Sequence, residues 1–469
     1  MSIKLQIANG FYRAKSLPLS HQECVNFYPS IQESPGALSD AILYGTPGAT
    51  SVAATVNPRE INRGAHVMGD IAYFVNGSHL YSCDSDYTVT SLGDITGDSR
   101  VSMADNGAQL MILVPGSTGY IYTVAGGLVT ISDGDFDANG NPQFLVFIDG
   151  YFACVTDTKQ WIISDLNDGT SWNALDFGSA ESDPDFPVAP VVVQNMLLIL
   201  GKSTTEGFQN VGGAGFAFTR NGIFIDKGCF APHAIVNANG TFFMVGGGKH
   251  EQPAIWAYQG NGYKKISHNA IDSYLNSLTE AEIESAFGFS YSANGASFVC
   301  FTFDGYTTFV YDTITGLWHE RRSRVQEVDQ RWRANSIVKL NGEFLVGDSY
   351  DGRIGRMSPD IYGEYGGDII RTFSTQVFES GGDSFALSKV ELTVESGVGN
   401  NAVPEPKMTM AASRDGKTWD FERMRGLGRV GEYARRVIWR GIGLFQRFGY
   451  LRFRLSSQVK PVIIKVEVE

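Results

Sequence analysis

Arginine is concentrated near one end of this chain, and this concentration is the strongest sign of chemistry in the sequence. Between positions 423 and 454, nine arginines face a single acidic residue, Glu432, and six aromatic residues lie among them. Guanidinium groups make forked hydrogen bonds and stack on aromatic rings, which favours protein interfaces and also suits a nucleic-acid backbone. The residues that we assign to a partner interface are Arg423, Arg425, Arg429, Arg435, Arg436, Trp439, Arg440, Arg447, Arg452 and Arg454.

The spacing of this segment predicts its geometry. In positions 451–455, Arg452 and Arg454 alternate with apolar residues, so that a basic strand face is expected opposite to a buried one. We predict contact with an acidic partner. A solvated strand face without a partner and contact with DNA both stay open as alternatives.

Two motifs that could bind phosphate or calcium are incomplete. Gly201–Thr204 (GKST) matches the end of a P-loop, but Met196 stands where the loop needs another glycine. Asp135–Gly140 matches the first half of an EF-hand loop, but Val146 stands where a bidentate Glu is required. We therefore expect no nucleotide, no other cofactor and no bound metal.

No catalytic arrangement is apparent in the sequence. Ser413–Trp419 is similar to the Asp-box hairpin of sialidases but is one residue short, and such boxes are structural turns. A glycosidase also needs two carboxylates, or a Tyr nucleophile with an arginine cluster, that converge on one site. The chain has neither HExxH nor GxSxG. We therefore expect that it is not an enzyme.

The net charge of -13 hides an asymmetry along the chain. Residues 371–469 hold 16 Lys and Arg against 11 Asp and Glu, which leaves 21 against 39 for residues 1–370. An acidic body with a basic C-terminal part is not typical of a general nucleic-acid binder. It suits a protein with two differently charged neighbours.

Cysteine usage and hydropathy indicate where the chain is made. The five cysteines are odd in number, widely separated and form no CxxC pair, which favours free thiols and synthesis in a reducing cytoplasm. Residues 1–16 have no continuous apolar region, so we expect no signal peptide. The longest apolar stretch, 188–200, is interrupted by polar residues and is too short for a membrane span, so we expect no membrane insertion.

A short turn followed by an apolar strand is repeated along the chain. This repeat indicates the fold that must position the residues discussed above. Its seven copies are separated by 38, 43, 45, 45, 55 and 47 residues, and they are centred on Gly69, Gly107, Gly150, Asn195, Gly240, Gly295 and Gly342. A period near 45 residues with several short strands is typical of β-propeller blades. Within the first copy, Asn76-Gly77 predicts the two central residues of a hairpin turn.

The sequence divides into three parts. We predict an N-terminal arm or ring-closing segment in residues 1–55, a β-propeller in 56–370 and a basic β-sandwich in 371–469. The propeller is expected to have about seven blades, with six as an alternative. Its longest step contains a short helical insert at 268–288, in which Thr279 and Glu282 form a capping-box pattern.

Several short segments resemble one known family, the packaged-DNA stabilization proteins, which are the tail-hub subunits of short-tailed phages. The first of these segments looks like the family's VNxYP element. The segments that carry the resemblance are Glu23–Pro29, Arg100–Ala104, Ser203–Glu206, Ile271–Phe289, Arg435–Arg440 and Phe448–Arg454.

This resemblance implies a structural, non-enzymatic protein of the virion tail, made in the bacterial host cytoplasm. Six copies would form a ring below the portal and its adaptor ring. The ring would retain the packaged DNA, which meets it only in passage through the channel, and would anchor the tail needle or plug and the tailspikes or fibres. A carbohydrate-active or glycan-binding propeller and a host scaffold propeller are the alternatives.

Overall fold

The computed structural model describes residues 2–55, 59–180, 183, 185–213, 215–303, 305 and 307–469. Strands dominate the described residues. The chain divides into two compact units. The first, called here the propeller unit, comprises residues 51–291 and 333–356; the second, called the sandwich unit, comprises residues 1–50, 292–332 and 357–469.

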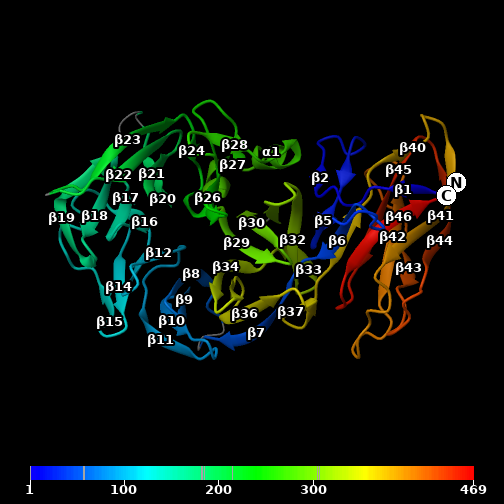
Figure 1. Ribbon diagram of the computed structural model, residues 1–469, viewed down its shortest axis with the longest axis horizontal. Coiled ribbons are helices and arrows are strands. Elements are labelled where there is room, and N and C mark those ends of the chain that lie inside the picture. Colours follow the sequence, from blue (N-terminus) through cyan, green and yellow to red (C-terminus); the bar gives the residue numbers. More distant parts are fainter. Residues whose placement is uncertain are drawn as a thin grey trace. The chain divides into compact units, whose positions relative to one another are not determined.

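The propeller unit is a succession of antiparallel sheets in which strands that follow one another in the chain pair with one another (Figure 1). The first sheet consists of β8 (Asn62–Met68), β9 (Ile71–Asn76), β10 (His79–Cys83) and β11 (Val89–Asp94). The second consists of β12 (Ser102–Asp105), β13 (Gln109–Leu113), β14 (Gly119–Thr123) and β15 (Gly127–Thr130). The third sheet consists of β16 (Pro142–Ile148), β17 (Tyr151–Thr156), β18 (Gln160–Asp165) and β19 (Asp168–Ser179). The fourth consists of β20 (Pro187–Val193), β21 (Met196–Gly201), β22 (Thr205–Asn210) and β23 (Phe218–Ile225).

A fifth sheet and a final hairpin complete the pairs inside this unit. The sheet holds β24 (Gly228–Cys229), β25 (Ile235–Ala238), β26 (Thr241–Gly247), β27 (Ala254–Tyr258) and β28 (Tyr263–Lys265), with the 3-10 helix η1 (Pro232–Ala234) before β25. The hairpin is β34 (Ala334–Leu340) and β35 (Glu343–Asp348). The strands whose residues are shared between the two units are β7 (Gly48–Ala54), β29 (Phe287–Ala293) and β36 (Arg353–Ser358).

All seven predicted turn residues lie between consecutive strands and have a positive φ, from +61° at Gly69 to +90° at Gly150. Asn195 takes the same conformation with φ +63°, which explains how it replaces glycine in the fourth copy. The predicted repeat is therefore a real structural repeat.

One turn differs from its prediction. The register pairs Asn76 with His79, so the two turn residues are Gly77 and Ser78 rather than Asn76 and Gly77. Gly77 has φ +52°, and neither Asn76 nor Ser78 has a positive φ. A two-residue turn with a positive φ only at its first central residue needs glycine at that position alone. The turn is therefore centred on Gly77 and Ser78, one residue later than predicted.

Apolar side chains fill the space between neighbouring sheets of the propeller unit. Tyr73 on β9 contacts Tyr122 on β14, with ring centroids 5.4 Å apart, and both belong to one buried cluster. Trp161 on β18 is fully buried and packs edge-on against Phe208 of β22 at 5.0 Å. Contacts of this kind between successive sheets are what radial packing of blades requires.

Within the propeller unit, residues far apart in the chain are joined at β8 and β34. Asn335 Nδ2 donates to the Asn62 carbonyl at 2.8 Å, and Ser336 Oγ donates to Asn62 Oδ1 at 2.7 Å. Buried residues of β9 and β35, including Phe74 and Leu345, pack in the same region. These contacts join the first and last sheets of the unit.

The helical insert contains α1 (Asn269–Leu275) and α2 (Glu280–Glu284). Ile271 and Leu275 are buried on the apolar side of α1. The predicted capping box of α2 is present, because the Thr279 side chain accepts from the Glu282 N–H and the Glu282 carboxylate accepts from the Thr279 N–H.

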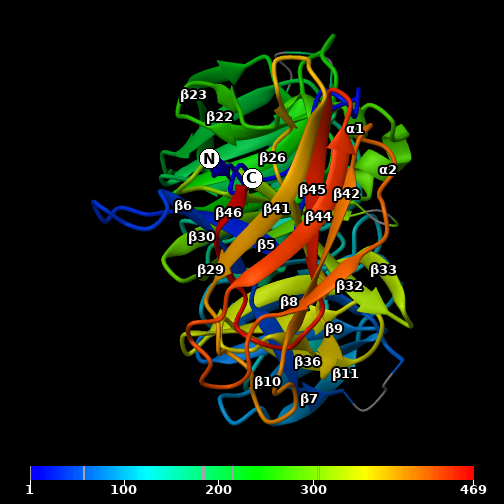
Figure 2. The ribbon, with the colours of Figure 1, turned by 90° about the vertical axis from the view of Figure 1, so that its right-hand side faces the viewer.

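Two sheets of the sandwich unit form its C-terminal part (Figure 2). One has the order β44 (Val437–Phe445), β41 (Phe385–Val394), β46 (Val462–Val468), β6 (Ala41–Gly45) and β5 (Phe27–Ile31), and β1 (Ile3–Leu5) also pairs with β46. The other includes β39 (Arg371–Ser374), β45 (Phe448–Leu455), β42 (Lys407–Ser413) and β43 (Arg423–Gly426), and β40 (Phe378–Glu379) pairs with β45.

Strands from three regions of the sequence join this second sheet. β4 (Cys24–Val25) pairs with β39 on one side and with β32 (Trp318–Val325) on the other. Beyond β32 lie β31 (Thr307–Asp312) and β30 (Ala296–Phe303). The remaining short strands are β2 (Tyr12–Arg13), β3 (His21–Gln22), β33 (Val328–Arg331), β37 (Gly363–Glu364) and β38 (Gly367–Asp368).

The core of the sandwich is aromatic. Phe373 stacks on Phe453 with ring centroids 4.9 Å apart, and Trp439 meets Phe453 edge-on at 5.6 Å. Because Trp439 belongs to one sheet and Phe453 to the other, these rings hold the two sheets together. The predicted N-terminal arm or ring-closing segment, residues 1–55, contributes β1, β4, β5 and β6 to these sheets.

Candidate interface of the C-terminal sandwich

The predicted arginine segment spans β43, β44 and most of β45, and the first two of these strands lie at one side of the sandwich. β43 is the last strand in the order of one sheet and β44 is the last strand in the order of the other. Two side chains connect them: Trp439 Nε1 donates to the Arg423 carbonyl at 2.7 Å, and Arg425 Nε donates to the Ile438 carbonyl at 3.0 Å. Arg423 and Arg425 of β43 therefore lie beside the first half of β44. The Trp439 and Arg425 side chains bridge the two strands at this side of the sandwich.

A further arginine that sequence reasoning missed covers the rest of β44. Arg414 donates to the carbonyls of Leu444 at 2.9 Å and Ile442 at 3.1 Å, and its guanidinium lies 4.9 Å from the centre of the Phe445 ring. Exposed strand edges invite pairing with other chains, and charged side chains are a common protection. Arg414 lies in the segment that resembles an Asp box, which was the one available signal.

That segment forms a tight polar turn. The Asp415 carboxylate accepts hydrogen bonds from the Lys417 and Thr418 N–H groups and from the Thr418 hydroxyl. These bonds, led by the one from the Thr418 side chain, hold the pKa of Asp415 well below its usual range. The turn shapes the backbone and leaves no carboxylate poised for acid-base chemistry.

A loop at residues 427–436, called here the arginine loop, connects β43 and β44. The Val430 N–H donates to the Pro404 carbonyl at 3.2 Å, and the Ser396 hydroxyl donates to the Tyr433 carbonyl at 2.7 Å. The Arg429 N–H donates to the Glu432 carboxylate at 3.0 Å. These hydrogen bonds tether the backbone of the loop to neighbouring segments of the sandwich.

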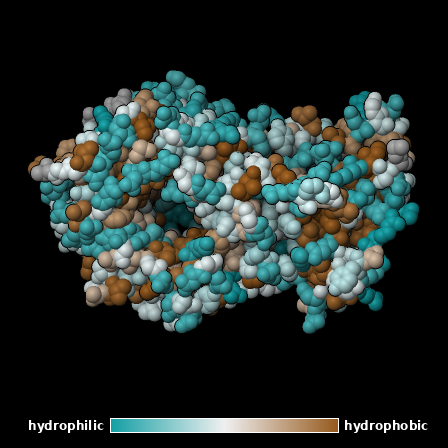
Figure 3. Space-filling view, in the orientation of Figure 1, coloured by the Kyte–Doolittle hydropathy of each residue, from teal (hydrophilic) through white to brown (hydrophobic). Residues whose placement is uncertain are grey.

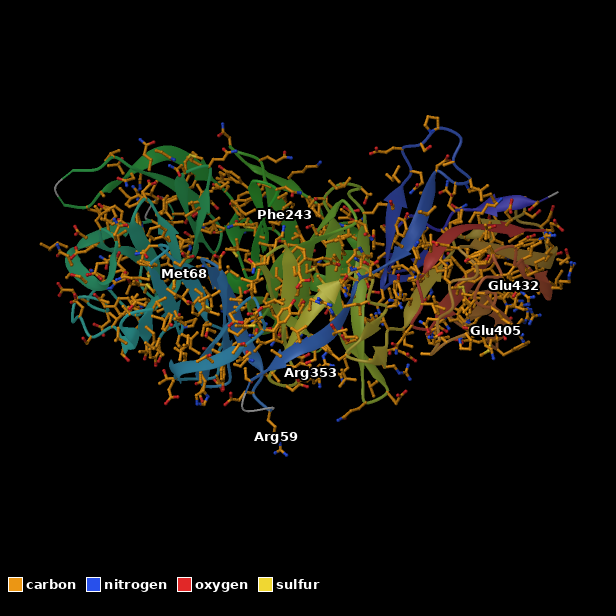
Figure 4. The ribbon with its side chains drawn as sticks, turned by 60° about the horizontal axis from the view of Figure 1, so that its bottom comes forward. Arg59, Met68, Phe243, Arg353, Glu405 and Glu432 are labelled. Atoms are coloured by element: carbon orange, nitrogen blue, oxygen red, sulfur yellow. The ribbon has the colours of Figure 1, made fainter. Side chains whose placement is uncertain are left out.

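The charges of the arginine loop are partly compensated. Arg429 lies 3.8 Å from Glu405, and Arg435 lies 3.5 Å from Glu432. Figure 4 labels Glu405 and Glu432, which lie in the same part of the sandwich. Arg429 is nevertheless 78% exposed, so its guanidinium remains available at the surface.

Arg436 makes the best-formed ion pair of the segment. Its Nε and Nη2 atoms donate to the two carboxylate oxygens of Glu391 at 2.7 and 2.6 Å. This pairing, against the opposing effect of burial and with help from Lys389, lowers the pKa of Glu391 to about 2. A forked pair of this kind fixes the orientation of an exposed arginine more than it stabilises the fold.

Arg452 and Arg454 lie on β45 and face other parts of the same unit. The Arg452 guanidinium lies 4.4 Å from the centre of the Trp419 ring, and its Nη1 is 3.9 Å from Glu23. Arg454 pairs with Glu422 at 3.2 Å. These two arginines therefore contact their own chain, which sequence reasoning did not foresee.

Glu23 is the centre of this contact. Arg13 donates to it at 2.8 Å, and His21 Nε2 lies 3.4 Å away. Burial raises the pKa of Glu23, but the His21 hydrogen bond and the charges of Arg13 and Arg452 outweigh it, and the net pKa is about 2.

The remaining predicted residues divide into exposed and buried ones. Arg440 on β44 and Arg447 in the turn before β45 are exposed. Trp439 is fully buried, because its ring fills the core between the sheets, so its side chain does not reach a partner.

Large apolar side chains lie exposed among the arginines. Tyr433 is 79% exposed and Phe421 71% exposed; the others are Met424, Val430 and Leu444. Figure 3 shows apolar residues among hydrophilic ones on the visible face of the sandwich. Arginine, tyrosine, phenylalanine and methionine are enriched in protein interfaces, and lysine is depleted. This side of the sandwich has that composition.

The other motifs singled out in the sequence take part in structural contacts. Lys202 of GKST pairs with Glu280 and with Glu284 of α2, the latter at 3.5 Å. Among the described residues, no three His, Cys, Asp or Glu side chains gather as a metal site would require. The five cysteines are buried. No helix in the described part of the chain is both long and apolar enough to traverse a bilayer.

Comparison with known proteins gives matches along nearly the whole chain. Residues 3–362 match the family model described as "Bacteriophage P22 Gp10, beta-propeller", and residues 370–469 match "Bacteriophage P22 Gp10, beta-sandwich". A characterised relative, the tail hub protein gp10 of Salmonella phage P22, is 21% identical over 444 residues, which cover 91% of this chain and 90% of the relative.

Solved structures are similar at a lower level. The WD40 β-propeller domain of Doa1 has 14% identity and a TM-score of 0.40, and covers 66% of this chain and 97% of its own. BamB from Moraxella catarrhalis has 11% identity and a TM-score of 0.38, and covers 72% of this chain and 98% of its own.

Proposed function

The chain belongs to the bacteriophage P22 Gp10 family, with its β-propeller and its C-terminal β-sandwich, and from this membership we propose that it is a tail hub protein of a short-tailed phage virion. The observation that carries the proposal is the relationship to the P22 tail hub protein over nine-tenths of both chains. Such a protein is a structural component rather than an enzyme.

In finer detail, we propose a ring of six copies below the portal and its adaptor ring. The ring retains the packaged DNA and anchors the tail needle or plug and the tailspikes or fibres. The contrast between an acidic body and a basic C-terminal part supports a position between differently charged neighbours. We also keep the predicted bounds, 1–55, 56–370 and 371–469, as a proposal for the functional parts.

The arginine side of the sandwich is proposed to bind an acidic protein partner rather than DNA. Arg414 and Arg425 donate to edge carbonyls, and Arg436 is held by Glu391, so several guanidinium groups are already engaged. Phosphate contacts require guanidinium groups that are free to replace counterions. Exposed Phe421, Met424 and Tyr433 between the arginines favour a protein surface instead.

The acidic body is proposed to ease the passage of DNA. Residues 1–370 carry 21 basic against 39 acidic side chains, and a surface of this sign repels a polyanion if it lines the channel. Adsorption of DNA to isolated hub rings at low salt would count against this part of the proposal.

The decisive experiment removes the gene from the phage. Particles that lack the protein are expected to package DNA, to lose it, and to show in images a tail that ends at the adaptor. Supplying the purified protein should restore DNA retention and the missing ring. Normal tails in the deletion phage would contradict the proposal.

A further inference from the structure

The propeller unit contains an apolar pocket of about 520 Å³. Its apolar lining comes from three successive sheets: Phe144 at the start of β16, Phe186, Pro187 and Val188 around the start of β20, and Phe230 and Pro232 after β24. Phe186 is 55% exposed, which is unusual for a side chain of its size. A pocket of this volume and lining can take a large side chain from a partner.

The polar lining of the pocket is mainly acidic. Asp157, Asp185 and Glu284 line it, against Lys202 as the one cation among the described lining residues. Lys202 is itself paired with Glu284 and Glu280. Asp185 accepts hydrogen bonds from the N–H and hydroxyl groups of Ser203 and Thr204 at 2.7 to 3.0 Å, so this part of the lining is fixed. The pocket therefore suits an apolar anchor with positive charges beside it.

The arginine loop of the sandwich has the complementary chemistry. Tyr433 and Val430 project from it with exposures of 79% and 59%, and Arg429, Arg435 and Arg436 flank them. The hydrogen bonds from Ser396 and to Pro404 hold its backbone, so little conformational freedom would be lost on docking. An exposed tyrosine among arginines is the type of residue that anchors interfaces.

We propose that the arginine loop of one copy of this chain docks in the apolar pocket of a second copy, with Tyr433 as the anchor. A ring of identical copies needs a head-to-tail contact between two different surfaces that fit each other. The loop, apolar and basic, and the pocket, apolar and acidic, form such a pair. The inference rests on the proposed ring and adds to it the surfaces that hold the ring together.

Cross-linking tests the contact directly. Tyr433→Cys and Phe186→Cys are made separately, and rings assembled from an equal mixture, alone or on the portal–adaptor complex, are treated with a short bis-maleimide. Because the five native cysteines are buried, the wild-type protein should give no product and serves as the control. We expect covalent dimers in the mixture, few in either variant alone, and a ladder of larger species from the double variant.

The possible outcomes distinguish failure of the docking contact from failure of the ring itself. Intact rings without cross-links in the mixture overturn the docking contact and leave the ring in place. Equal dimers from Tyr433→Cys alone also overturn it, because they indicate a symmetric contact between loops. Wild-type chains that never form rings, even with portal and adaptor, overturn the ring itself.

Substitutions give a second measurement that does not depend on chemistry at cysteine. Tyr433→Asp and Phe186→Asp should each weaken ring assembly by about thirtyfold or more, as loss of an interface anchor does. Matched controls are Leu38→Asp in the sandwich unit and Leu175→Asp in the propeller unit, which are 65% and 79% exposed and lie outside both surfaces. Unchanged thermal unfolding shows that each variant is folded. Equal assembly of Tyr433→Asp and Leu38→Asp would overturn the inference.

Discussion

The amide of Asn26 and the backbone of Arg322 exchange two hydrogen bonds. The Arg322 N–H donates to Asn26 Oδ1 at 3.0 Å, and Asn26 Nδ2 donates to the Arg322 carbonyl at 3.0 Å and to the Ile370 carbonyl at 2.8 Å. One buried side chain thus joins the N-terminal segment, β32 and the residue that precedes β39. All three regions lie in the sandwich unit.

Replacing Asn26 should destabilise the sandwich unit. Asn26→Ala removes the three hydrogen bonds, leaves part-buried backbone groups without these partners and keeps a non-glycine residue at φ +56°. We expect a loss of about 3 kcal/mol or more in the free energy of unfolding, measured with urea. Asn26→Gly loses the same bonds without the backbone strain, so it should be about 1 kcal/mol more stable than Asn26→Ala. Equal stability of the wild type and Asn26→Ala would contradict this account.

Glu23 should make the fold sensitive to acid. Its pKa is about 2 in the folded chain and near 4.5 when unfolded, so the unfolded chain binds its proton first as the pH falls. The stability that Glu23 contributes is therefore complete above about pH 4.5 and disappears toward pH 2, and it amounts to about 3 kcal/mol. Glu23→Gln should lower the stability at pH 7 and remove this part of the acid dependence. An unchanged slope between pH 4.5 and 2 would refute the assignment.

His319 should act in a different pH window. The ring is fully buried, 5.4 Å from Phe298 and 6.2 Å from Tyr28, and neither nitrogen has a hydrogen-bond partner among the residues that the structure describes. Burial, and secondarily the charge of Arg321, lowers the pKa of His319 to about 3.

The unfolded chain therefore takes up this proton near pH 6.5, whereas the folded chain resists it until about pH 3. Stability should fall by about 1.4 kcal/mol for each pH unit below 6.5, or about 2 kcal/mol at pH 5. Unfolding of the wild type and of His319→Phe is compared at pH 7.5 and pH 5. The variant should lose less stability than the wild type, and parallel losses would show that His319 does not carry the effect.

Structural features could be predicted from the sequence where the interacting residues are close together in the chain. Contacts between residues far apart in the chain could not. The turn period identified the strands, because Gly69 and its counterparts must adopt a positive φ within a few residues of the strands that they connect. The capping box of Thr279 and Glu282 was found for the same local reason. The family resemblance marked Glu23–Pro29, but only the structure shows that Asn26 bonds to Arg322 and that Glu23 meets Arg452.

The arginine segment shows the same limit. Its charge was evident, and the alternation around Arg452 correctly placed a basic face on a strand. The burial of Trp439 and the engagement of Arg452 with Trp419 depend on residues from other strands or loops, so composition alone could not separate exposed arginines from those that hold the fold. Arg414 was missed because its side chain covers backbone carbonyls of a distant strand, and the Asp-box-like pattern around it indicates a turn rather than that contact.

Replacing Arg414 should affect aggregation through the edge of β44 much more than it affects the free energy of unfolding. Arg414→Ala removes two hydrogen bonds to the carbonyls of Ile442 and Leu444 and the contact with Phe445. Since those carbonyls can bond to water instead, the free energy of unfolding should fall by only about 1 kcal/mol. The uncovered edge of β44 can then pair with another chain, so concentration-dependent aggregation, followed by light scattering, should increase much more than stability decreases. Arg447→Ala, at an exposed position in the next turn, is the matched control and should change neither quantity. Aggregation of Arg414→Ala no faster than that of Arg447→Ala would show that the guanidinium does not protect this edge.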